Sequence, residues 1–103
     1  MLTIIRGTTP TIRFRFKTIT PNQIIAAYLC VRQHDRTIIE KDMSNATVGE
    51  EYLSFKLSQE DTLKLCRHHE GAIGLDWKAS DNTRGRSKIL IFKTEDSGKD
   101  ETI

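Results

Sequence analysis

Residues 11–17 alternate between hydrophilic and apolar side chains without a break. A period of two predicts a β-strand with one buried face, because a helix would scatter the same side chains around its circumference. The predicted inner face holds Ile12, Phe14 and Phe16, and the predicted outer face holds Thr11, Arg13, Arg15 and Lys17. The chain therefore needs a sheet with one face on a core and the other towards water or a partner.

Further short segments show strand-like patterns separated by polar turns. They are residues 2–5, 23–33, 37–41, 46–48, 51–57, 72–80 and 87–94. Between them, Ser58 and Asp61 have the spacing of a capping box, which predicts one short helical turn near 59–65. About seven or eight short strands at this spacing predict an all-β fold, an antiparallel β-sandwich of immunoglobulin-like architecture.

The length and composition are those of one small domain. The chain has 103 residues, 37% of them apolar, and a formal net charge of +2. We expect one sandwich domain over 1–94 and a polar, flexible tail over 95–103. The near-balanced charge argues against a dedicated nucleic-acid binder. The chain start does not have the pattern of a signal peptide, and no apolar run approaches the roughly 20 residues of a membrane helix. We therefore expect a cytoplasmic location, with Cys30 and Cys66 as reduced thiols.

Two predicted strands, within 23–33 and 89–92, are apolar on both faces. Such a strand is usually covered on both sides. A small sandwich has a single core, so the outer face must be covered either by a loop or by another subunit. We therefore expect protein partners or self-association. The hypothesis is that an oligomer or assembly interface is lined by the outer-face residues Ile24, Tyr28, Leu90 and Phe92.

One cluster contains the residue types that bind metals or act as nucleophiles, namely Cys66, His68, His69 and Glu70. Its spacing matches no structural zinc pattern, and adjacency in sequence differs from the spatial pairing of a Cys–His nucleophile. A solvated polar loop is the favoured interpretation. We expect no catalytic residue, metal or cofactor, although metal binding by Cys66, His68 and His69 stays open.

The basic face formed by Arg13, Arg15 and Lys17 has two interpretations. It could bind phosphates or an acidic partner, or it could be a solvated outer face whose charges prevent edge pairing. The second interpretation is favoured, and whether this face binds anything stays open. Trp77 is expected in the core rather than on a binding surface.

Two motifs support a family resemblance. They are Ile5-Arg6-Gly7-Thr8-Thr9-Pro10-Thr11, directly before the alternating strand, and Leu57-Ser58-Gln59-Glu60-Asp61-Thr62-Leu63, where a strand runs into a turn. With the hairpin and last apolar strand that follow, they resemble small proteins encoded in phage and prophage structural gene clusters of Gram-positive bacteria. The resemblance implies a β-sandwich protein of the virion, near its tail or baseplate, and lends no catalytic residue. Relatives close on a hydrophobic–acidic tail, which only Glu101-Thr102-Ile103 matches faintly.

The sequence thus predicts a non-enzymatic phage or prophage structural or assembly protein that acts through protein–protein contacts. The alternative is a small carbohydrate- or ligand-binding sandwich module, with Trp77 or Tyr52 as its platform. An enzyme that uses Cys66, His68 and His69 is a third and weaker interpretation.

Overall fold

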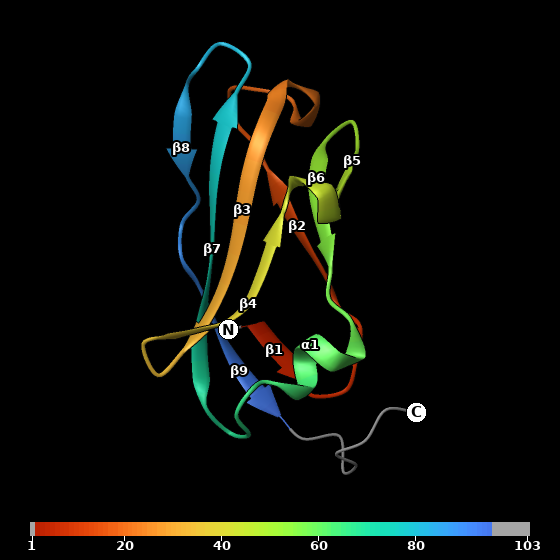
Figure 1. Cartoon of the computed structure of the whole chain (residues 1–103), viewed down its shortest axis with the longest axis vertical. Helices are drawn as coiled ribbons and strands as arrows, with labels where there is room; N and C mark the ends of the chain where they lie inside the picture. Colours follow the sequence, from red (N-terminus) through yellow and green to blue (C-terminus); the bar gives the residue numbers. More distant parts are fainter. Residues whose placement is uncertain (1, 96–103) are drawn as a thin grey trace.

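The computed structural model describes residues 2–95 and consists mainly of short strands (Figure 1). The elements, in chain order, are β1 (Leu2–Ile5), β2 (Thr11–Arg15), η1 (Pro21–Gln23), β3 (Ile24–Gln33), β4 (Arg36–Asp42), η2 (Met43–Asn45), β5 (Ala46–Val48), β6 (Tyr52–Lys56), α1 (Gln59–Leu63), β7 (Glu70–Ala79), β8 (Arg84–Arg86) and β9 (Leu90–Glu95). No helix among these residues is long and apolar enough to cross a membrane.

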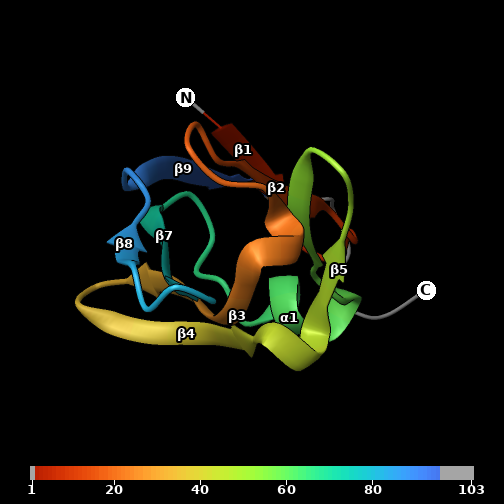
Figure 2. The same cartoon turned by 90° about the horizontal axis from the view of Figure 1, so that it is seen from above.

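The strands form two sheets that enclose one core. The six-stranded sheet has the order β1-β9-β7-β3-β4, with β8 as an extra partner of β7, and the three-stranded sheet has the order β2-β6-β5. Seen from above, the larger sheet curves around one side of the molecule, and β2 and β5 lie on the other (Figure 2). β1 pairs with β9 in parallel, and all other pairs are antiparallel. The predicted sandwich is confirmed, although a strand, β8, forms where a turn was expected.

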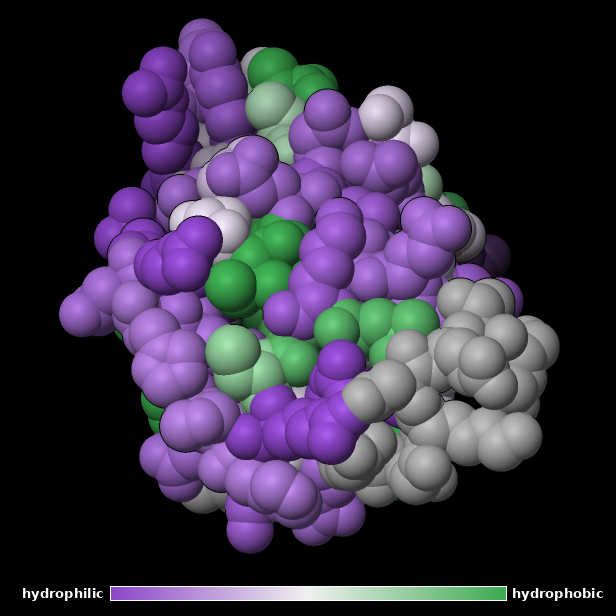
Figure 3. All heavy atoms as spheres, turned by 60° about the horizontal axis from the view of Figure 1, so that its bottom comes forward, coloured by the Kyte–Doolittle hydropathy of each residue, from purple (hydrophilic) through white to green (hydrophobic). Residues whose placement is uncertain are grey.

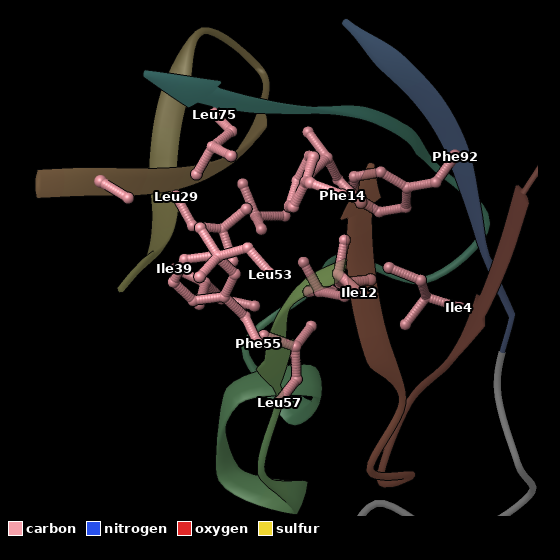
Figure 4. Packing of buried hydrophobic residues seen from close by; sticks show 14 of the residues in the cluster. Ile4, Ile12, Phe14, Leu29, Ile39, Leu53, Phe55, Leu57, Leu75 and Phe92 are labelled. Atoms are coloured by element: carbon pink, nitrogen blue, oxygen red, sulfur yellow. The ribbon is translucent and has the colours of Figure 1, made fainter. Parts of the chain in front are cut away.

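The strand β2 anchors the core as its alternation predicts. Ile12 and Phe14 are almost fully buried, and the ring of Phe14 packs edge-on against Phe55 of β6, with 6.1 Å between centroids. Phe16 lies just beyond the strand, which ends at Arg15. Its ring packs edge-on against Trp77 of β7. Side chains from both sheets thus interdigitate in one core, as Figure 4 shows.

The strand β3 lies between β7 and β4, in the central position predicted for a strand apolar on both faces. The placement of Ile24 on its outer face is wrong, because Ile24 is only 5% exposed and belongs to the core. The pairing with β7 shifts register between Ile24 and Ala26, and Ile25 points outward instead. A β-bulge of this kind reverses the side-chain alternation on one side of it.

The strand β9 also presents the opposite face from the one predicted. Phe92 is fully buried, so its placement on an outer interface is wrong. Ile91 projects outward, whereas Leu90 lies opposite the buried Ile73 and projects inward. Glu95, expected as the first residue of the tail, is still paired in β9. Residues 96–103 lie outside the described part of the chain.

Candidate interaction surfaces

The two motifs that carry the family resemblance meet at one end of the sandwich. Gly7 has a φ of 81°, and its N–H donates to Oγ1 of Thr62 in α1 (2.9 Å). The Thr62 hydroxyl donates in turn to the carbonyl oxygen of Thr8 (2.8 Å). Arg6 Nε donates to the carbonyl oxygen of Leu65 (2.9 Å). The turn and the helix therefore hold each other in place, and both motifs are structural.

Asp61 completes the predicted capping box and adds an ion pair. Its N–H donates to Ser58 Oγ (3.0 Å), and its carboxylate accepts from the Ser58 N–H (2.9 Å) and from Lys41 Nζ (2.9 Å). Burial opposes ionisation of Asp61, but these hydrogen bonds and the Lys41 charge outweigh it and lower the pKa of the carboxyl. The charge of Asp61 is therefore neutralised within the fold by Lys41.

A buried glutamine holds the loop that carries Cys66 and His69. Gln33 is 2% exposed, and its Oε1 accepts from the Cys66 N–H at 2.7 Å. Its Nε2 donates to Oγ1 of Thr94 (3.1 Å) and to the carbonyl oxygen of His69 (3.3 Å). Sequence reasoning missed Gln33, because a glutamine at a strand end gives no pattern that indicates burial.

The side chains of the same loop do not form a metal cluster. Cys66 is exposed, and His68 adopts left-handed backbone geometry with a φ of 58°. The ring of His69 packs edge-on against His34, with 4.5 Å between centroids. No group of three or more His, Cys, Asp or Glu side chains converges anywhere within residues 2–95. His69 of this loop therefore lies against His34, which follows β3, and no third ligand within residues 2–95 joins the two histidines.

The outer face of the six-stranded sheet is hollowed along β7. Two neighbouring hollows of about 230 and 500 Å³ share Arg32, Ala72 and Ile89 as lining residues. We call this surface the β7 groove. Its further lining residues are Cys30, Gly74, Asp76 and Arg86 in the smaller hollow, and Gln33, His34, Asp35, Glu70, Gly71 and Ile91 in the larger. A Cβ atom at Gly74 would meet no atom within 4 Å, so no side chain covers the floor there.

The rim of the β7 groove combines exposed isoleucines with paired charges. Ile89 is 63% exposed and Ile91 is 48% exposed. Asp76 accepts a hydrogen bond from Arg86 Nε of β8 at 2.6 Å. Sequence reasoning missed both isoleucines because it assigned the outer face of the last strand to Leu90 and Phe92. The sequence did contain the information, because the alternation places Ile89 and Ile91 on one face of the strand and Leu90 and Phe92 on the other.

Tyr28 lies on the same outer face, as predicted, next to the groove on β3. It is 40% exposed. A hydrogen bond to the carboxylate of Glu40 on β4 raises the pKa of Tyr28 to about 12. The exposure of Tyr28 agrees with the interface hypothesis, and its role in an interface stays a prediction.

The outer face of the three-stranded sheet is basic. Arg13 and Arg15 are exposed on β2, opposite Ser54 and Tyr52 of β6, and Lys56 lies opposite Thr11. None of these three cations forms an ion pair with another residue of the described chain. The basic face predicted from the alternation is therefore present at Arg13 and Arg15, and Lys56 extends it, whereas Lys17 lies beyond the end of β2.

Trp77 packs as a core residue rather than as a platform. Its ring is covered by Phe16 on one side. At Gly85 of β8 a Cβ atom would come within 2.3 Å of the indole, so the backbone of β8 lies directly against the ring. Tyr52, the other aromatic residue considered as a platform, is 38% exposed on β6.

Comparisons with known proteins identify the fold and nothing finer. No family model matches the chain, and no curated protein sequence matches it. The immunoglobulin-like domain of mouse leukocyte-associated immunoglobulin-like receptor 1, solved as a strand-swapped dimer, aligns with a TM-score of 0.50 and 16% identity over 90% of this chain and 85% of that one. Murine CRIg aligns with a TM-score of 0.42 and 13% identity over 92% and 90% of the two chains. The two-sheet architecture and the likeness to the first of these domains show that the fold is an immunoglobulin-like β-sandwich.

Proposed function

We propose that this protein is a non-enzymatic assembly protein that associates with a second copy of itself through the β7 groove. The observation that carries the proposal is the uncovered floor at Gly74 beside the exposed Ile89 and Ile91. Apolar side chains gathered around a hollow are typical of the buried centre of a protein contact. The family resemblance supports a place among phage or prophage structural proteins.

A second copy is a suitable occupant because the charges around the groove are balanced. Asp76 is already paired with Arg86, and Glu70 lies opposite Lys93 on the neighbouring strand. A twofold dimer places the same patch on both partners, so a patch with a strong excess of one charge would repel its copy. The charges that line the groove are mixed rather than of one sign, which avoids this repulsion.

The oligomeric mass at micromolar concentrations tests the contact. We expect a dimer by light scattering that dissociates at least tenfold more readily in Ile91→Arg, because a guanidinium would be buried against an apolar surface. Thr47→Arg is the control, since Thr47 is exposed on the outer face of the other sheet, opposite Ser54. A wild-type protein that remains monomeric at all concentrations would contradict the proposal.

Two further variants locate the contact. Gly74→Leu should fold, because open space lies above Gly74, and it should still prevent close packing of two sheets. In a Cys66→Ser background, alkylation of Cys30 inside the groove should slow as the protein concentration rises. If Tyr28→Lys leaves the dimer intact, Tyr28 lies outside the interface.

The proposed role in phage or prophage assembly has a separate test, which is the gene neighbourhood. Capsid, tail or portal genes beside the coding sequence would support an assembly role. A surrounding metabolic operon would rule it out, even if the chain dimerises through the β7 groove.

A further inference from the structure

The strand β2 has one unpaired edge. It pairs only with β6, and no other residue of 2–95 bonds its second side. The Leu57 N–H donates to the carbonyl oxygen of Pro10 (2.9 Å), which makes these two residues a hydrogen-bonded pair. Along an antiparallel ladder, hydrogen-bonded pairs alternate with pairs whose backbone groups point away from the partner strand. The backbone N–H and C=O groups of Arg13 and Arg15 therefore point away from β6, towards the free edge.

Apolar side chains are left uncovered on the inner side next to this edge. Leu2 and Leu90 lie opposite Phe92 and Ile73, which are fully buried, so both leucines face the core side of their sheet. They are nevertheless 43% and 41% exposed. Within residues 2–95, the three-stranded sheet has no strand beyond β2 that could cover them.

The figures show how this space arises. Figure 4 shows Ile4 and Phe92 pointing from β1 and β9 towards Ile12 and Phe14 of β2, while the ribbons of β1 and β2 diverge from their shared turn. Figure 3, which turns the β1, β9 and α1 end forward, shows apolar surface in the middle of a hydrophilic surround.

The outer side of the same edge carries unmatched positive charge. Arg13 and Arg15 have no carboxylate partner within the described chain. On the six-stranded sheet, by contrast, Arg86 is paired with Asp76. A strand added beside β2 would place alternate side chains next to these two arginines and the others above the uncovered leucines.

We propose that the free edge of β2 accepts an extended segment of a partner protein in which acidic and apolar residues alternate. Its backbone pairs with the free N–H and C=O groups of Arg13 and Arg15, as in other cases of strand addition. Its carboxylates face the two guanidinium groups, and its apolar residues cover Leu2 and Leu90. This surface is separate from the β7 groove, and the proposal does not rest on the proposed function.

Amide hydrogen exchange with a synthetic peptide tests the proposal. The probe is a nine-residue peptide of alternating glutamate and valine, and its control has the same composition in two blocks. In the free protein the amides of Arg13 and Arg15 should exchange quickly, while those of Ile12 and Phe14, bonded to β6, exchange slowly. The alternating peptide should slow exchange at Arg13 and Arg15 at least tenfold.

Charge variants provide the second readout. The double variant Arg13→Glu, Arg15→Glu should weaken peptide binding at least tenfold, and the milder Arg13→Gln, Arg15→Gln serves if the first does not fold. Arg36→Glu, at an exposed position on the edge strand β4, is the matched control and should bind normally. Failure of the alternating peptide to protect the β2 amides would overturn the proposal. So would equal binding of the block peptide, or tight binding of single-stranded DNA without amide protection, which would indicate a polyanion surface.

Discussion

The α1 end of the sandwich and the free edge of β2 use similar chemical groups in opposite ways. At the α1 end, a backbone N–H, a hydroxyl, a carboxylate and an arginine all have partners within the chain, centred on Thr62 and Asp61. At the β2 edge, the backbone groups and guanidinium groups of Arg13 and Arg15 have none among the described residues. Polar groups that are paired internally stabilise the fold, and those left open are available to a partner. Stability measurements should therefore separate the two regions.

The largest loss is expected for Asp61→Asn at the α1 end. The change leaves Lys41 without its counter-ion in a site where both side chains are largely buried. We expect the free energy of unfolding to fall by about 3 kcal/mol, measured by urea denaturation. Asp81→Asn is the control, because Asp81 accepts hydrogen bonds only from Thr83, in an exposed turn, and forms no ion pair within residues 2–95. Equal losses in the two variants would show that the ion pair adds nothing.

The same carboxyl predicts how stability depends on pH. The pKa of Asp61 is lowered in the fold, with the opposing effect of burial outweighed by hydrogen bonds and by Lys41. Its contribution is therefore present above the unfolded pKa of about 4 and is lost as the pH falls through the lower, folded value. The stability difference between wild type and Asp61→Asn should narrow below about pH 4. A constant difference down to pH 2 would contradict this assignment.

A similar but smaller loss is expected for Gln33→Leu. The substitution leaves the N–H of Cys66 and the hydroxyl of the buried Thr94 without their glutamine partner. We expect a cost of about 2–3 kcal/mol and faster amide exchange at Cys66. Unchanged exchange at Cys66 would show that other contacts hold the loop.

Gly7→Val should cost roughly 1–3 kcal/mol, because a branched side chain is strained at the φ of 81° that Gly7 adopts. Gly74→Val is the control, since Gly74 has no positive φ and its Cβ would enter open space. Thermal unfolding of the two variants gives the comparison. A neutral Gly7→Val would mean that the turn relaxes at little cost.

The smallest effect on stability is expected at the β2 edge. Arg13→Gln with Arg15→Gln should change the free energy of unfolding by less than about 0.5 kcal/mol, because both side chains are exposed and unpaired within residues 2–95. The same variant should lose affinity for the alternating acidic peptide. A loss of stability above about 1 kcal/mol would place these arginines among the structural residues and remove the contrast with the α1 end.

Local patterns in the sequence predict the elements, but they do not say which face of a strand is inside. The alternation of residues 11–17 predicts the strand that begins at Thr11, and the spacing of Ser58 and Asp61 predicts the capping box. Both features depend on near neighbours in the sequence, and both are present. Ile24 was misplaced because a bulge in the pairing with a distant strand reverses the alternation. Phe92 was misplaced because its inner position depends on Gly71, where a Cβ atom would come within 2.4 Å of the Phe92 ring.

The candidate surfaces could be predicted only in part for the same reason. The basic face of β2 is local to one strand and was visible in the sequence. The β7 groove requires Gly74 of β7 to lie beside Cys30 of β3 and near Ile89. Strand order and register create that proximity, and no local pattern encodes either.

The parallel pairing of β1 with β9 sets a condition on how this chain folds. Leu2 lies opposite Phe92, so the contact closes a loop that spans nearly the whole sequence. The chain must lose the entropy of closing this loop before the pairing contributes any stabilisation, and contacts between distant residues slow folding. During synthesis, β1 would remain without its partner strand until β9 had emerged.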